Sequence, residues 1–224
     1  MDANVRVMRW PKRGNETLSA PLDEREKEAM IASATAKLEE LFDILSIDHQ
    51  NDHNTCGTPH RVATMYVEEL LEGRFAAPPR ITEFENILGY DDLIVTGPID
   101  LRSTCAHHLM PIVGQAYIGI VPSKEGRIIG LSKYDRIVSY FAARLQIQEE
   151  LVRQIGDYIN DVTQPMGLGI RISAVHMCKT HRGVRASHRS RMVSTAYYGT
   201  MLTDPSLKQR FMQECIGLER GIDL

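Results

Sequence analysis

Two short groups of metal-ligating side chains, far apart in the sequence, constrain how this chain can fold. Positions 105–108 read Cys-Ala-His-His, and positions 176–178 read His-Met-Cys. Thiolate and imidazole are ligands that Zn²⁺ prefers, and a set of three protein ligands leaves one position open for water. Cys105, His108 and Cys178 can share one metal ion only if the two groups meet. The sequence therefore predicts a fold that brings them together, in preference to ordinary buried thiols.

The remaining histidines and cysteines of these segments divide into two kinds. His107 and His176 each lie next to or near an expected metal ligand, and imidazole is suited to proton transfer near neutral pH. We predict that both act as acid–base groups, the alternative being structural histidines. Cys56 and Cys215 have no ligand partners nearby in the sequence, which favours ordinary thiols.

The segments around the two ligand groups have the alternating pattern of strands. Residues 111–122 alternate and end at a charged turn, and residues 93–101, 169–176 and 192–198 are further strand candidates. Two helical patterns lie between them, one beginning at Leu131 and the other running from about Gln148 to Val162. The predicted order is β-β-α-α-β-β. Hairpin connections favour an antiparallel sheet, so the predicted class is α+β.

The N-terminal third has a helical pattern instead. Apolar residues recur at spacings of three and four from Asp23 to about Leu45, and a second helix begins at Thr58-Pro59 and ends at Gly73. These predict an antiparallel helical hairpin. The expected organisation is a flexible tail (1–22), a helical region (23–79), a catalytic domain (80–203) and a C-terminal helix (204–224).

Composition excludes several classes of protein. The net charge is −3, so no global basic signal for nucleic acid is present. No apolar run approaches the length of a membrane span, so no membrane association is expected. The four cysteines are too sparse for a disulfide framework, which favours the reducing cytoplasm.

Positive charge is nevertheless concentrated beside the expected metal ligands. Ser132, Lys133 and Arg136 open one predicted helix, whose first backbone amides favour phosphate. A second basic group follows Cys178: Lys179, Arg182, Arg185, Arg189 and Arg191. Such groups suit a phosphorylated substrate, the alternative being a solvated basic face or a nucleic-acid contact. Glu149, taken alone, is typical of an ordinary acid in a first helical turn.

Taken together, these motifs resemble the GTP cyclohydrolase I family over roughly residues 25 to 202. The matching segments occur in the order of the family, with similar spacing. They are 58–66, 103–108, 130–133, 136–138, 148–149, 176–178 and 182–184.

The resemblance implies a tunnelling fold (T-fold) and a homodecamer of two stacked pentamers, with active sites at subunit interfaces. It implies a Zn²⁺ ion held by Cys105, His108 and Cys178, and acid–base roles for His107 and His176. The residues that match the family's substrate-binding positions fall into two sets. Gln148 and Glu149 match those for guanine, and the triphosphate set is Ser132, Lys133, Arg136 and Arg182.

The implied reaction converts GTP to 7,8-dihydroneopterin triphosphate and releases C8 as formate, for folate and pterin biosynthesis. Ala106 departs from the pattern, because relatives usually carry an acidic residue there. Three alternatives are a role in 7-deazaguanine synthesis, a divergent enzyme with altered substrate or incomplete turnover, and a zinc-bearing GTP-binding regulatory protein without catalysis.

Overall fold

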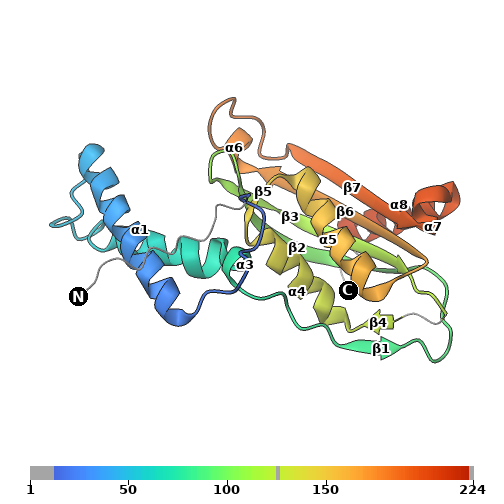
Figure 1. Cartoon of the computed structure of the whole chain (residues 1–224). Coiled ribbons are helices and arrows are strands. Elements are labelled where there is room, and N and C mark those ends of the chain that lie inside the picture. Colours follow the sequence, from blue (N-terminus) through green and yellow to red (C-terminus); the bar gives the residue numbers. More distant parts are fainter. Residues whose placement is uncertain (1–12, 125–126, 222–224) are drawn as a thin grey trace. The chain divides into compact units, whose positions relative to one another are not determined.

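The structure, a computed structural model, describes residues 13–124 and 127–221. The chain divides into two compact units, Met1–Ala77 and Pro78–Leu224. Figure 1 shows helices in the first unit, and a curled sheet with helices in the second.

The first unit is helical, as its periodicity predicts. Asp23 caps the first helix in a capping box. The Asp23 side chain accepts a hydrogen bond from the Glu26 backbone amide, and the Glu26 side chain accepts one from the Asp23 backbone amide. The elements are α1 (Glu24–Ile44), α2 (Thr58–Thr64), a π-helix η1 (Met65–Leu70) and α3 (Glu72–Phe75). The core of this unit is formed by Leu22, Ile31, Ala63, Val67 and Phe75.

Of the segment expected to be a flexible tail, residues 1–12 lie outside the described residues, and residues 13–22 make contacts with the helical unit. The Leu18 and Leu22 amides donate to the Arg74 and Phe75 carbonyls, each over 2.9 Å. Leu22 is buried in the helical core. This segment is therefore part of the helical unit, because its apolar side chain and backbone bonds are satisfied there.

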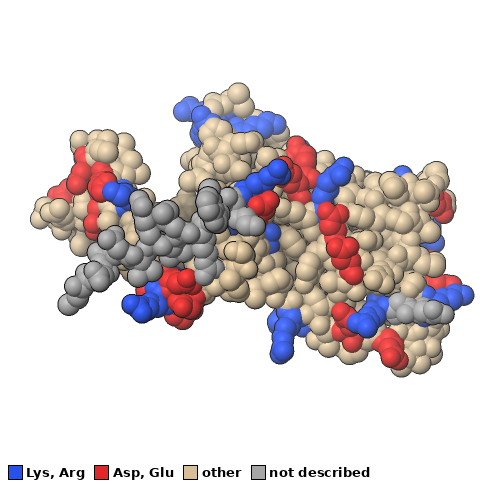
Figure 2. Space-filling view, in the orientation of Figure 1, with Lys and Arg blue, Asp and Glu red and all other residues tan. Residues whose placement is uncertain are grey.

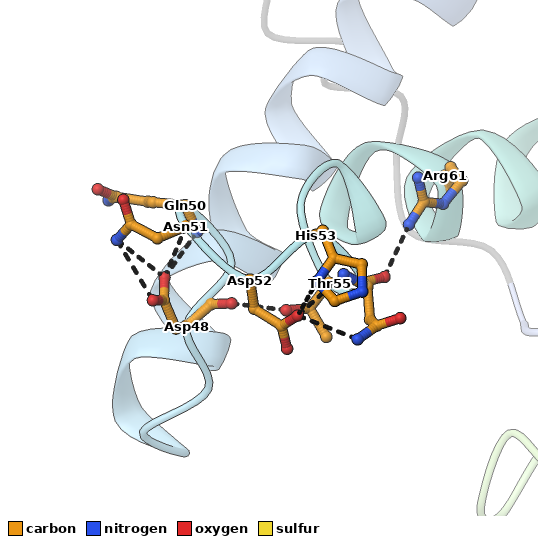
Figure 3. Close-up of polar contacts among 8 residues, drawn as sticks. Asp48, Gln50, Asn51, Asp52, His53, Thr55 and Arg61 are labelled. Carbon is orange, nitrogen blue, oxygen red and sulfur yellow. Dashed lines mark hydrogen bonds and ion pairs between the residues drawn. The ribbon is translucent and has the colours of Figure 1, made fainter.

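The connection from α1 to α2 is built by polar side chains that close local turns (Figure 3). The Asp48 carboxylate accepts from the Gln50 and Asn51 amides, over 3.0 and 2.8 Å. The Asp52 carboxylate accepts from the Asn54 amide over 2.9 Å. These Asx turns fix the path of the chain into α2 without regular structure.

The second unit is built on a five-stranded sheet with the order β5-β2-β3-β6-β7. The strands are β2 (Ile94–Cys105), β3 (Pro111–Val121), β5 (Leu145–Gln146), β6 (Gly167–His176) and β7 (Arg191–Gly199). Neighbouring strands are antiparallel except β2 and β5, which are parallel. The α+β class is thus confirmed.

Helices cover both faces of this sheet. The helices of this unit are α4 (Leu131–Ala142), α5 (Gln148–Thr163), α6 (Met177–Thr180), α7 (Thr200–Thr203) and α8 (Pro205–Arg220). Ala116 and Ile118 of β3 pack in the core with α4 and α5, whereas Tyr117 between them packs with Phe211 of α8. This alternation places α4 and α5 on one face and α8 on the other, as Figure 1 shows.

Two short strands interrupt the order expected from the sequence. β1 (Glu83–Glu85) and β4 (Arg127–Ile129) form a separate antiparallel pair, and Arg127 makes an ion pair with Glu83. The order in the second unit is therefore β1, β2, β3, β4, α4, β5, α5, β6, α6, β7, α7 and α8. In the described part of the chain, no helix is both long and apolar enough to cross a membrane.

Candidate active site

Cys105 lies at the end of β2, where the chain turns tightly into β3. Its amide donates to the Met110 carbonyl over 2.8 Å, and its carbonyl accepts from the Leu109 amide over 2.9 Å. Leu109 adopts a left-handed conformation with φ 54°. The turn buries Cys105 and leaves His107 and His108 exposed. The local sequence thus presents one buried thiol and two accessible imidazoles at one sheet end.

Cys178 reaches the same sheet end from a remote part of the sequence. It lies in the short helix α6, which follows β6 directly. β3 pairs with both β2 and β6, and His176 lies opposite Ile112 at the start of β3. The ligand atoms of Cys105, His108 and Cys178 all lie within 4.8 Å of one another. The structure therefore brings together the three residues that the sequence singled out as metal ligands.

The chemistry of this group fits a soft divalent cation. Two sulfur atoms and one imidazole nitrogen suit zinc, and the partial exposure of the group leaves one side accessible. Burial raises the pKa of the Cys178 thiol, and the adjacent Cys105 thiol raises it further. A cation bound between the two thiols would act in the opposite direction, because coordination favours the thiolate.

His176 and His107 differ in their surroundings. His176 is half-buried at the end of β6, and its Nε2 lies 2.8 Å from Oε1 of Gln148. Burial lowers the pKa of His176, the Glu149 carboxylate opposes this shift, and the Lys179 charge adds to it. His107 is exposed, and its ring lies edge-on to that of His108 with centroids 6.4 Å apart. Both imidazoles therefore lie close in sequence or space to the ligand group.

Two consecutive residues at the start of α5 face different environments. Gln148 is fully buried, whereas Glu149 is exposed. The Glu149 carboxylate lies in the first helical turn, where the helix dipole stabilises negative charge. It is near enough to His176 to influence the pKa of that ring.

The expected phosphate-binding residues lie on two separate elements. Ser132, Lys133 and Arg136 occupy the first turns of α4, with Ser132 and Arg136 exposed. Arg182 is exposed on the loop from α6 to β7, where Figure 2 shows a group of basic side chains. Its charge offsets a small part of the rise that burial causes in the pKa of Cys178. Among residues 13–124 and 127–221, no hydrogen bond or ion pair joins Arg182 to the α4 set.

Sequence reasoning missed one participant, Ser194 on β7. Its hydroxyl lies 3.0 Å from Nε2 of Gln148, behind the residue that contacts His176. The sequence offers no direct signal for this contact, since Ser194 lies on a strand with no motif around it. The register pairs Ser194 with Ile172, which is what places it beneath the start of α5.

Comparison with known proteins assigns the chain to a family. The model of the family described as GTP cyclohydrolase I matches residues 34–216. Proteins named GTP cyclohydrolase 1 from Salmonella choleraesuis (strain SC-B67) and Salmonella arizonae (strain ATCC BAA-731 / CDC346-86 / RSK2980) are each 35% identical over 203 residues, covering 90% of both chains. The chain belongs to the GTP cyclohydrolase I family. It is therefore an enzyme of the hydrolase class, as the resemblance predicted.

A solved structure was also matched, at a low level of similarity. The archaeosine synthase QueF-Like in the apo form is 12% identical, with a TM-score of 0.38. The match covers 49% of this chain and 94% of that one.

Proposed function

We propose that this enzyme converts GTP to 7,8-dihydroneopterin triphosphate and formate in a zinc-dependent reaction that serves folate and pterin biosynthesis. The observation that carries the proposal is the convergence of Cys105, His108 and Cys178 within 4.8 Å in a chain of this family. Three such ligands leave one coordination position open, which is typical of catalytic zinc. Zinc bound there supplies a Lewis acid that activates water at neutral pH.

The protein's own groups then move protons and hold the substrate. His107 and His176 flank the ligand group, and we assign to them the proton transfers that accompany opening of the imidazole ring and loss of C8. Of the two residues expected at guanine, Glu149 is the exposed one. Its carboxylate is suited to accept hydrogen bonds from the N–H groups of the guanine edge.

The triphosphate is assigned to the basic residues of α4 and of the loop after α6. Ser132 and Lys133 lie in the first turn of α4, the end of a helix that favours phosphate, and Arg136 follows one turn later. Arg182 adds a guanidinium that can bind phosphate oxygens in a bidentate manner. The family resemblance implies that such a site is completed by a second copy of the chain.

We propose that copies of this chain join into the T-fold ring and decamer of the family. β7 is an edge strand, with no partner on its outer side among the described residues. β2 is paired on its outer side by β5 only at Thr104 and Cys105. Two such open edges favour sheet continuation between copies. A native mass of ten chains of 25.3 kDa each is expected, and a monomeric mass would refute the assembly.

The reduced thiols that the metal site needs also support the predicted cytoplasmic location.

The test is incubation of the zinc-loaded protein with GTP, followed by identification of the products. We expect formate and a pterin that becomes fluorescent on oxidation, both quantified by mass spectrometry. The Cys178→Ser variant should lose zinc and turnover together, while Cys56→Ser, which changes an exposed thiol outside the ligand group, should keep both. Absence of GTP turnover by the zinc-loaded protein would refute the proposal. A ring-opened formamide as the final product would instead indicate incomplete turnover, which we would trace to Ala106.

A further inference from the structure

The Gln148 side chain is a buried amide whose oxygen and nitrogen both have partners. It is fully buried at the start of α5. Its Nε2 lies 3.2 Å from the Ile172 carbonyl oxygen, 3.1 Å from the Met192 carbonyl oxygen and 3.0 Å from the Ser194 hydroxyl. Its Oε1 lies 2.8 Å from Nε2 of His176. Acceptors on β6 and β7 thus hold the NH₂ group of the amide, and the imidazole of His176, at the end of β6, contacts its oxygen.

The partners of Gln148 determine which way its amide points. The carbonyl oxygens of Ile172 and Met192 can only accept hydrogen bonds, so the group that faces them must be the NH₂. A flipped amide would place its oxygen against two other oxygens and leave buried acceptors unsatisfied, which costs about 1–3 kcal/mol for each group. The amide oxygen therefore faces His176.

The orientation of the amide in turn determines the tautomer of the imidazole. An amide oxygen cannot donate, so the short contact of 2.8 Å requires that Nε2 of His176 carries the hydrogen. The lone pair of the neutral ring then lies on Nδ1. Among residues 13–124 and 127–221, no hydrogen bond to Nδ1 is present, so its lone pair is not engaged by the described part of the chain.

We propose that Gln148 is a positioning residue that fixes the orientation and tautomer of His176, so that Nδ1 is the nitrogen that exchanges a proton with the substrate. This inference rests on the proposed function, because it assumes that His176 transfers protons during GTP conversion. It differs from the guanine contact that the resemblance implies for Gln148. A fully buried side chain with all its groups engaged has no surface to offer a base, whereas Glu149 beside it is exposed.

The two roles predict opposite kinetic effects. If Gln148 orients His176, Gln148→Leu should lower kcat by about 10- to 100-fold, within the range that general acid–base catalysis contributes. The equilibrium Kd for GTP and the zinc content should change little. If Gln148 contacts guanine, Kd should rise and kcat at saturation should be retained. Gln154→Leu is the matched control, since it removes another amide of α5, bonded to Gln146 and not to His176.

A second variant separates positioning from simple disruption. Gln148→Glu keeps an acceptor for Nε2–H of His176 but places an acid against the two carbonyl oxygens. We expect Gln148→Glu to retain more of kcat than Gln148→Leu even where its melting temperature is lower. If kcat instead follows the melting temperature across the variants, the role is structural and the proposal is wrong.

A crystal structure of the zinc-loaded Gln148→Leu variant provides a readout that does not depend on activity. We expect the His176 ring to be rotated away from its wild-type orientation while Cys105, His108 and Cys178 keep theirs. An unrotated ring together with full kcat would overturn the proposal. Absence of GTP turnover by the wild-type protein would refute the proposed function instead, and the ring orientation would still be measurable.

Discussion

The contact between Phe211 and two glycines allows a sharp prediction about the face of the sheet that carries α8. Gly119 of β3 and Gly169 of β6 lie directly opposite each other, and the fully buried Phe211 ring packs on both. A Cβ atom on Gly119 would lie 2.4 Å from Cδ2 of the ring. A Cβ atom on Gly169 would lie 3.1 Å from Cδ1 and Cε1 at the other edge. The two substitutions are therefore chemically identical but sterically different.

The expected loss of stability follows from these distances. In Gly119→Ala the ring must move, and it is enclosed by Tyr117, Met201 and Cys215, so an overpacking cost of about 1–3 kcal/mol applies. Replacing a strand glycine returns roughly 0.5–1 kcal/mol by restricting the unfolded chain. Because a separation of 2.4 Å calls for the upper half of the overpacking range, about 2–3 kcal/mol, we expect a net destabilisation of about 1–2.5 kcal/mol. In Gly169→Ala the Phe211 ring needs to shift by only a few tenths of an ångström. The overpacking cost is then about as large as the gain from restricting the unfolded chain, so the stability should change little.

The assay is urea unfolding followed by circular dichroism, at one protein concentration and one zinc concentration. The midpoint of Gly119→Ala should fall with the m value unchanged, and the midpoint of Gly169→Ala should stay near that of the wild type. Adding Phe211→Leu to Gly119→Ala should cost less than the two single changes together, because the smaller side chain removes the clash. A Gly119→Ala protein as stable as the wild type would refute the packing described here.

Three further predictions concern the site and the last helix. Cys178→Ser should remove zinc, measured by elemental analysis, and full activity without zinc would disprove the ligand set. Glu149→Ala should raise the Kd for GTP with zinc retained, whereas loss of zinc would show that Glu149 is misassigned. Hydrogen bonds from Ser206 and Leu207 lower the pKa of Asp204, the cap of α8. The ionised Asp204 carboxylate therefore stabilises the folded protein fully at pH values above its pKa in the unfolded chain, about 3.9. This contribution is lost as the pH falls through the lower pKa that Asp204 has in the folded protein. Asp204→Asn should weaken this acid dependence of the urea midpoint, and an unchanged dependence would contradict it.

Much of the second unit was predictable because its segments carry strong local patterns. The alternation at 111–122 predicted a strand that the structure has at Pro111–Val121, and the helix expected from Gln148 begins at that residue. The signals are local: an alternating sequence pattern at 111–122, and a Pro and a Gly after α5. Such patterns fix element type and, through the hairpins, the antiparallel pairing.

The elements that the sequence did not predict depend on contacts distant in the chain. β1 and β4 have three residues each, which is too few to show an alternating pattern. Their pairing also joins segments that are separated in the sequence by the whole of β2 and β3. The π-helix at Met65–Leu70 interrupts a run that reads as continuous α-helix. Residues 13–22 pack on α3 through backbone bonds, which composition does not reveal.

In the candidate site, too, the identity of the ligands was predictable from the sequence, whereas the surroundings of the neighbouring side chains were not. Cys105, His108 and Cys178 were predictable because soft ligands have few other reasons to occur in such groups. The neighbours of Gln148 were not, because two of its partners are backbone carbonyl oxygens on β6 and β7. Backbone acceptors have no sequence signature, so the surroundings of a buried amide become visible only once the register of the strands is known.

The start of α5 explains how two adjacent polar residues can serve different steps of one reaction. A helix turns its successive side chains by about 100°. Gln148 therefore faces the sheet and bonds to His176, while Glu149 faces solvent beside the same imidazole. In the roles proposed for them, Gln148 would act through the geometry of His176 and change kcat, whereas the Glu149 carboxylate would contact the bound guanine and change Kd. We therefore expect Gln148→Leu to lower kcat and Glu149→Ala to raise the Kd for GTP, although the two residues are adjacent. If both variants raise the Kd and keep kcat, both side chains contact the same ligand.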